Sequence, residues 1–102
     1  MPAKRALIMH PADNVATAVE EIASGDEARI PVAKEFRSLT AAEAIPFGFK
    51  IALEDIPQGA RIVKYGETIG KASVPIARGT VVHIHNLEGT RARGDLAKKE
   101  DA

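Results

Sequence analysis

The segment IPFGFKI (Ile45–Ile51) contains the pattern that decides the fold. An isoleucine is followed by a turn with glycine at its fourth position, and then by a second isoleucine. The same pattern, Ile-x-x-Gly-x-x-(Ile/Val), recurs as IPQGARI at residues 56–62 and as IARGTVV at residues 76–82. In each copy the first isoleucine can anchor in the core, glycine can take a positive φ, and a strand can leave the turn. The pattern predicts a mainly β domain built from short strands and Gly/Pro turns.

Length and composition bound the remaining possibilities. The 102 residues suffice for one domain, and a hydrophobic content of 45% favours a folded chain. The 14 basic and 14 acidic residues balance, so no overall field attracts nucleic acid or an acidic membrane. Three phenylalanines, one tyrosine and no tryptophan argue against a base-stacking surface. The absence of cysteine excludes disulfides, thiol catalysis and cysteine-ligated metals.

The two ends of the chain carry little organisation of their own. The apolar run within MPAKRALIMH is too short for a signal peptide or a membrane-spanning helix. We therefore expect a cytoplasmic protein without a membrane partner. The domain is expected to span residues 1–90. The charged stretch at 91–102 has no apolar period and is expected to form a flexible tail.

The stretch after Pro11 predicts one helix. Apolar residues at positions 15, 18, 19, 22 and 23 follow the i, i+3, i+4, i+7, i+8 spacing of an amphipathic helix. Asp13 and Asn14 are suitable N-caps, and Gly25 is suitable as the residue that ends the helix. The expected fold is thus mainly β, with one N-terminal amphipathic helix.

A strand is predicted before this helix and a hairpin after it. ALIMH (Ala6–His10) is apolar and ends at a proline, which is typical of a short strand. ARIPV (28–32) and FRSLT (36–40) together predict a β-hairpin. The three turn repeats begin at positions 45, 56 and 76, which is too uneven for a solenoid. We therefore expect a compact, irregular arrangement of short strands.

Two of the three histidines lie in the alternating run GTVVHIHNLEG at residues 79–89. On a strand, His83 and His85 would share one face, close enough to bind one metal ion or two oxygens of one substrate. The alternative is that both are hydrogen-bonded packing residues, because a metal site needs further ligands and none is evident. The local pattern favours the packing role.

Two other short segments offer polar groups to a ligand. In VKYGETIG (Val63–Gly70), Lys64 and Tyr65 can present a cation and a phenolic hydroxyl to a carboxylate. In HPADN, His10 and Asp13 stand at the expected helix start, where free N–H groups can hold a carboxylate. The alternatives are an ordinary hairpin with a solvated lysine, and a helix cap with no further role. No Ser/His/Asp nucleophile motif, phosphate loop or dinucleotide fingerprint is present.

Taken together and in order, HPADNVATAV, FKIALEDI, IVKYGETIGKA and VVHIHN resemble the SAF-type domain of altronate and galactarate dehydratases, the UxaA family. The resemblance covers roughly residues 5–90 and implies a β-clip fold, present in the family as a fused domain or a separate small subunit. The family's polar signature falls on nine residues of this chain: His10, Asp13, Asn14, Lys50, Lys64, Tyr65, His83, His85 and Asn86. One position departs: Phe49 stands where the family commonly has histidine.

The resemblance also implies an activity. Family members dehydrate sugar acids to 2-keto-3-deoxy acids, with iron or another divalent metal assisting loss of the β-hydroxyl. The metal and the main base lie in a large domain, so a catalytic large subunit is the expected partner of this small subunit. The resemblance favours His83 and His85 as catalytic residues and leaves open whether they bind a metal. The remaining seven signature residues are expected to contact the sugar-acid substrate.

Two other functions stay open at this point. A related small subunit belongs to sulfolactate sulfo-lyase, where the β-leaving group is sulfite in place of water. A non-enzymatic SAF module for carbohydrate binding or assembly is the third interpretation, and it does not account for the lysine, tyrosine and histidine motifs. Exposed strand edges in so small a β domain can also pair between copies, which would give a homo-oligomer.

Overall fold

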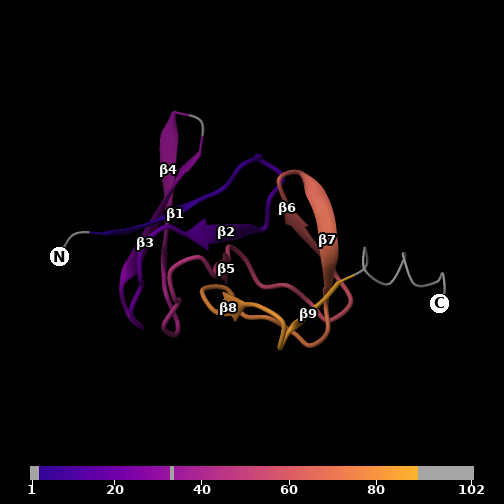
Figure 1. Ribbon diagram of the computed structural model, residues 1–102. Coiled ribbons are helices and arrows are strands. Elements are labelled where there is room, and N and C mark those ends of the chain that lie inside the picture. The colour runs from indigo at the N-terminus through magenta and orange to yellow at the C-terminus, as the bar shows by residue number, and fades with distance from the viewer. Residues whose placement is uncertain (1–2, 33, 90–102) are drawn as a thin grey trace.

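The computed structural model describes residues 3–32 and 34–89, and these form nine short strands (Figure 1). The strands are β1 (Lys4–Leu7), β2 (Val15–Ala18), β3 (Glu27–Val32), β4 (Glu35–Thr40), β5 (Lys50–Ala52), β6 (Arg61–Lys64), β7 (Glu67–Ala72), β8 (Val81–Val82) and β9 (Leu87–Glu88). One sheet has the order β4-β3-β1-β2-β5-β8 and the other the order β6-β7-β9. The predicted mainly β fold is confirmed, and the proposed tail at 91–102 lies outside the described residues.

The predicted N-terminal helix is wrong. The described residues contain no helix, and Val15–Ala18 is strand β2. Val15 packs in one core cluster, whereas Ala16 and Ala18 pack in the other, so both faces of β2 are buried. A strand with two buried faces lacks polar alternation, and its run of apolar residues therefore mimics a helical stripe. Nothing in the described part of the chain forms a helix that could cross a membrane.

The turn repeat is confirmed and has a fourth copy, which was hidden inside the predicted helix. The four turns end in glycines whose φ lies between 86° and 90°: Gly25, Gly48, Gly59 and Gly79. Each turn follows a buried isoleucine, and these isoleucines join in two antiparallel bridges, Ile22 with Ile45 and Ile56 with Ile76. Their N–H to carbonyl oxygen distances are 2.7 to 3.0 Å. The two bridges thus join the turns in pairs and connect the short strands of the domain.

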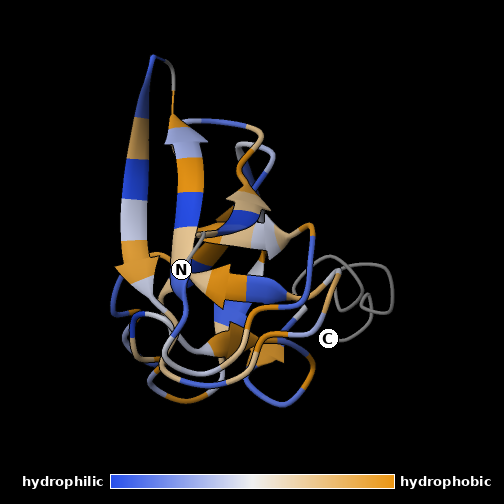
Figure 2. Ribbon diagram, turned by 90° about the vertical axis from the view of Figure 1, so that its left-hand side faces the viewer, coloured by the Kyte–Doolittle hydropathy of each residue, from blue (hydrophilic) through white to orange (hydrophobic). Residues whose placement is uncertain are grey.

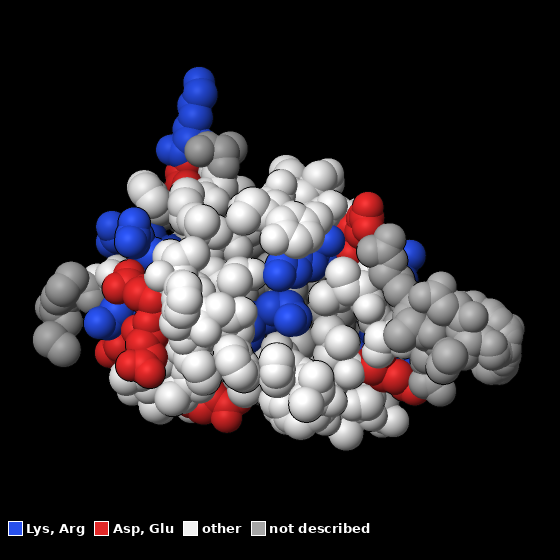
Figure 3. Space-filling model, viewed as in Figure 1, with Lys and Arg blue, Asp and Glu red and all other residues white. Residues whose placement is uncertain are grey.

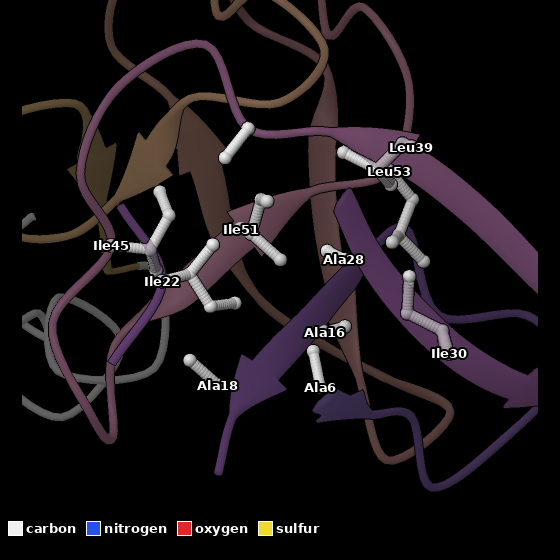
Figure 4. Packing of buried hydrophobic residues seen from close by; sticks show 11 residues of the cluster. Ala6, Ala16, Ala18, Ile22, Ala28, Ile30, Leu39, Ile45, Ile51 and Leu53 are labelled. Atoms are coloured by element: carbon white, nitrogen blue, oxygen red, sulfur yellow. The ribbon is translucent and has the colours of Figure 1, made fainter. Parts of the chain in front are cut away.

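Two core clusters lie on opposite sides of the middle strands. Ile51 and Leu53 of the β5 region pack in the first cluster, and Ala52 packs in the second. Figure 4 shows Ile22, Ile45 and Ile51 grouped together in the first cluster. Because successive side chains of a strand point to opposite faces, β5 contributes to both clusters, and its half-buried first residue, Lys50, lies on the same face as Ala52.

The hairpin expected at residues 28–40 is confirmed, and it projects from the body of the domain (Figures 1 and 2). Figure 2 shows hydrophilic and hydrophobic residues alternating along its strands. The parallel ladder between β1 and β3 ends at the pair Arg5 and Arg29. Pro31 follows two residues later and has no N–H to donate, so the hairpin can leave the sheet there. The predicted strand at Ala6–His10 is displaced toward the N-terminus, at Lys4–Leu7.

Candidate functional site

Asp13 ties the loop after β1 to the turn of the β6–β7 hairpin. Its side chain is buried, and its carboxylate accepts from the N–H of Met9 at 3.0 Å and from the N–H of Gly66 at 2.8 Å. Burial alone would raise the pKa of this carboxyl. Hydrogen bonds outweigh burial and hold the pKa below its ordinary value; the donors are the backbone N–H groups of Gly66, Met9, Tyr65 and His10. Asp13 is therefore an ionised anchor and not the predicted helix cap.

The anchored loop brings the imidazole of His10 against the hairpin turn. A Cβ atom added to Gly66 would lie 2.9 Å from Cγ and Cδ2 of His10, so only glycine allows this approach. Nδ1 of His10 accepts from the N–H of Ala12 at 3.0 Å. In the neutral ring this places the proton on Nε2, which makes Nε2 a hydrogen-bond donor toward the exposed surface.

Asn14 joins the two sheets through its amide group. Oδ1 accepts from the N–H of Val63 at 2.8 Å, and Nδ2 donates to the carbonyl oxygen of Arg61 at 2.9 Å. Both partners lie on β6, so Asn14 holds β6 beside β2 in place of starting a helix. Its predicted contact with substrate stays a prediction.

The turn between β6 and β7 holds Tyr65 in a conformation that is rare outside glycine. Tyr65 has a φ of 58° and Gly66 a φ of 72°, and two successive positive values are those of a type I′ hairpin turn. The left-handed conformation costs roughly 1 kcal/mol at a residue such as tyrosine. The ring is 57% exposed, and the ammonium of Lys64 lies 5.0 Å from its centroid. A strained, exposed phenol beside a cation favours a binding role.

The charge of Lys64 acts on Lys50 although the two residues are on different sheets. Lys50 is half-buried, and its neighbours across the strands, Thr17 of β2 and Val82 of β8, carry no charge. Burial and the charge of Lys64 both lower the pKa of Lys50. Figure 3 shows Lys and Arg side chains at the centre of this face, surrounded by uncharged ones.

The geometry expected for the two histidines is wrong, because strand β8 ends at Val82 and residues 83–86 form a turn. Asn86 builds this turn: Oδ1 accepts from the N–H of His83 and Nδ2 donates to the carbonyl oxygen of Val81, both at 2.9 Å. A side chain that bonds its own neighbouring backbone in this way replaces the strand ladder. His83 and His85 therefore do not share a strand face.

The imidazole of His83 stacks instead on Phe49, with ring centroids 4.2 Å apart and an angle of 29° between the planes. The sequence analysis identified Phe49 as a departure from the family pattern but did not predict which side chain it contacts. His85 is exposed to solvent. Among the described residues no three His, Cys, Asp or Glu side chains are grouped so that they could hold a metal ion.

The predicted site residues therefore form two groups. The lysine group, named here for its charge, contains His10, Asp13, Asn14, Lys50, Lys64 and Tyr65, and the histidine turn contains His83, His85 and Asn86. Phe49 and Lys50 are consecutive, so their side chains point to opposite sides of the chain where β5 begins. The two groups thus meet at the start of β5 from opposite sides. The sequence did not predict the close contact between Gly66 and the His10 ring, although Gly66 is the glycine of the KYG motif.

Comparison with known proteins identifies the family of this chain. The family model described as altronate/galactarate dehydratase SAF domain matches residues 4–90. Altronate dehydratase of Escherichia coli K12 is 41% identical over 76% of this chain, and galactarate dehydratase (L-threo-forming) of the same organism is 40% identical over 71%. The alignments cover 15% and 13% of those two relatives. The chain thus spans a small part of the dehydratases that it matches.

A second kind of relative has a different length. The (2R)-sulfolactate sulfo-lyase subunit alpha of Chromohalobacter salexigens is 31% identical over 82% of this chain, and the alignment covers 94% of that protein. Its name identifies that protein as one subunit of a multi-subunit enzyme. The relatives are thus named for two different reactions, those of a dehydratase and of a sulfo-lyase.

Proposed function

Because the chain belongs to the altronate/galactarate dehydratase SAF domain family, we propose that it is a lyase subunit that lines a pocket completed by a larger partner chain. The observation that carries the proposal is the lysine group. It combines two ammonium groups whose charges act on each other, a strained tyrosine turn and an imidazole, and these come from three separate segments. Like charges and backbone strain both cost stability, and such costs are typical of functional sites.

The proposed reaction is a β-elimination from a 2-hydroxy acid. A base removes the proton from the carbon that carries the carboxylate, the electron pair forms a carbon–carbon double bond, and the β-substituent leaves. The enol that results tautomerises to a 2-keto acid. In the first candidate function the substrate is an aldonate or aldarate of the altronate or galactarate type, and the leaving group is water. In the second it is sulfolactate, and sulfite leaves; the 94% coverage of a sulfo-lyase subunit supports this alternative.

In either reaction this chain binds and orients the acid. Lys50 and Lys64 contact the substrate carboxylate, and the Tyr65 hydroxyl donates a hydrogen bond beside them. His83 and His85 are the candidates for contact with a substrate hydroxyl. The divalent metal of such lyases, iron by family resemblance, is assigned to the partner, because the described residues offer no group of three ligands. No step assigned to this chain passes through it.

Reconstitution with the proposed larger partner chain tests the proposal. Turnover of altronate, galactarate or sulfolactate should require both chains, and the accepted acid then decides between dehydratase and sulfo-lyase. His83→Ala and His85→Ala should each lower turnover while thermal unfolding of this chain stays unchanged. Failure of the paired chains on all three acids, with both chains folded, would reject the lyase assignment. It would leave the non-enzymatic module as the better interpretation.

A further inference from the structure

From the exposed surface between β1 and the β3–β4 hairpin we infer a docking site for the larger partner chain. Its occupant is a segment of that chain with a carboxylate, which binds between Arg5 and Arg29, and a neighbouring apolar side chain, which packs against Phe36. The docking site rests on the proposed function, because that function requires a larger partner chain. None of the three residues belongs to the lysine group or to the histidine turn.

The strand register places the two arginines side by side. Arg5 of β1 and Arg29 of β3 are partners in the parallel ladder, and both are exposed. Their neighbours in sequence, Ala6 and Ala28, are buried in the first core cluster, so both arginines point outward from the sheet. Neighbouring strands lie about 4.8 Å apart, so one carboxylate can contact both guanidinium groups.

The acidic residues near this pair leave it a positive charge. Glu20 contacts Arg5: its Oε2 accepts from the backbone N–H at 2.8 Å and lies 3.5 Å from Nε. The Arg5 side chain is still 73% exposed, and a contact through Nε alone lacks the two parallel bonds of a closed arginine–carboxylate pair. Glu27 shares the outer face of β3 with Arg29 but lines a different hollow. An acidic occupant therefore meets a favourable field.

An apolar hollow adjoins the two arginines. The β1–β3 ladder ends at this pair, and beyond it the hairpin projects from the body of the domain (Figure 1). The hollow has a volume of about 370 Å³ and is lined by Ala3, Arg5, Leu7, Arg29, Pro31 and Phe36. The guanidinium of Arg29 lies over the Phe36 ring, 5.5 Å from its centroid. Stacking uses the flat face of the guanidinium and leaves its N–H edge to bind a carboxylate.

The composition of this surface favours a protein segment as the occupant. Phe36 is 62% exposed, and phenylalanine and arginine are both enriched in protein interfaces. A sugar acid carries hydroxyls along its chain and has no apolar part to bury in the hollow, whereas a protein segment offers a carboxylate and an apolar side chain together. The alignment covers 15% of altronate dehydratase, and the sulfo-lyase relative is named as a subunit, so both relatives provide further protein for such a contact.

The same hairpin connects this surface to the lysine group. Pro31 lines the hollow beside Arg29 and also a second hollow, together with Met9, His10 and Val32. A partner segment held in the first hollow therefore lies next to the loop that carries His10. Docking there brings the larger chain to the edge of the proposed substrate pocket.

The isolated chain tests the chemistry of the site. Phenylacetate, which joins a carboxylate to an apolar ring, should shift the NMR signals of Phe36 and Arg29 saturably, with a dissociation constant in the millimolar range. Acetate lacks the ring and 2-phenylethanol lacks the charge, so each should bind about tenfold more weakly. Arg29→Gln should weaken phenylacetate binding about tenfold. Arg37→Gln is the matched control, because Arg37 follows Phe36 and its exposed side chain points to the opposite face of the hairpin.

No saturable response to phenylacetate, equal binding of the three probes, or unchanged binding in Arg29→Gln would overturn the inference. The reconstituted two-chain enzyme then tests the occupant. Arg29→Gln and Phe36→Ser should each weaken association of the two chains about tenfold. Phe47→Ser, which changes a phenylalanine that is 70% exposed in another turn, should leave association unchanged. Thermal unfolding of these isolated variants should match that of the parent chain, which separates docking from folding.

The two possible failures can be told apart. Unchanged association in Arg29→Gln and Phe36→Ser would reject the docking site, with a small acid as the occupant if phenylacetate still binds. Turnover by that complex would leave the proposed function standing. Weakened association in both variants, with no turnover of any of the three acids by the parent complex, would instead reject the lyase assignment and retain the docking site.

Discussion

The lysine group and the histidine turn differ in how the chain holds them. Asp13 and Asn14 attach the lysine group through hydrogen bonds between residues 47 to 53 positions apart in sequence. The histidine turn is held by Asn86, whose side-chain bonds reach residues only three and five positions away. The first arrangement exists only in the folded domain, and the second is largely local. The positions of the two lysines therefore depend on the whole fold, while the turn at 83–86 depends mainly on side-chain bonds within its own stretch of chain.

The largest effect expected from this difference belongs to Asp13. Replacing it by alanine leaves buried N–H groups unsatisfied on two segments, and should lower the free energy of unfolding by about 3 kcal/mol. Asp26→Ala is the matched control, because Asp26 accepts from a nearby N–H, that of Ala23, in an exposed turn. Its cost should be about 1 kcal/mol. Urea unfolding measures both, and equal costs would show that the long-range anchor has no special weight.

Gly66 gives the next effect in size. Gly66→Ala should cost about 2 kcal/mol, because a Cβ meets both a positive φ and the His10 ring. Gly48→Ala has the same sign of φ but no atom within 4 Å, and should cost about 1 kcal/mol. If the ring contact is the cause of the difference, adding His10→Ala to Gly66→Ala should recover part of the loss. If the stability costs of the two substitutions simply add, the His10 ring does not cause the difference, and His10 would no longer be counted as part of the site.

Asn86 tests the local arrangement. Asn86→Ala removes two side-chain hydrogen bonds of the 83–86 turn and should cost about 1.5 kcal/mol. The NMR signals of His83 and Phe49 should change, since the stack depends on the turn. Those of Lys50 and Lys64 should stay as they are. Coupled shifts in the lysine signals would mean that the two groups form one cooperative unit.

The pH dependence of stability separates Asp13 from Lys50. The pKa of Asp13 is lowered by folding, so its contribution is complete above the pKa of the unfolded chain and is lost as pH falls through the folded value. The pKa of Lys50 is also lowered, but the charged form is the disfavoured one, so stability rises as pH increases through the folded pKa of Lys50. Asp13→Asn should flatten the acid limb of the curve and Lys50→Gln the alkaline limb.

The smallest effect expected is a gain in stability. Lys50→Gln removes a half-buried charge that Lys64 repels, and should raise the free energy of unfolding slightly at neutral pH, since solvent screens most of the repulsion at a partly exposed group. Lys71→Gln should leave it unchanged. Denaturant midpoints at one fixed ionic strength compare the two. A loss of stability in Lys50→Gln would indicate an attractive contact at Lys50 and contradict the repulsion assigned to the pair.

The turn-and-strand character of the fold could be predicted because its signal is local. An isoleucine, a glycine and the turn between them are sufficient to identify a β-turn at residues 45, 56 and 76, and the hairpin at 28–40 has a similarly short-range pattern. The helix prediction failed because β2 lies between two cores and has no exposed face. Asp13 and Asn14 are good helix caps by residue type, and only distant partners on the β6–β7 hairpin show that they have another use.

For the site, motif resemblance selected the residues but not their geometry. His10, Lys64 and Tyr65 gather at one hairpin turn, which the separate motifs did not show. The strand expected through His83 and His85 was wrong, because Asn86 can bond its own neighbours and close a turn. The stack of Phe49 on His83 depends on the pairing of β5 with β8, which no short stretch of sequence contains.

The central claim is that Lys50 and Lys64 are held close enough to repel each other. NMR titration of the Lys50 side chain in the isolated chain measures this repulsion directly. The pKa of Lys50 should lie below the ordinary lysine value and should rise in Lys64→Gln, while burial keeps part of the depression in place. A pKa of Lys50 at its ordinary value, or one that does not respond to Lys64→Gln, would contradict the account.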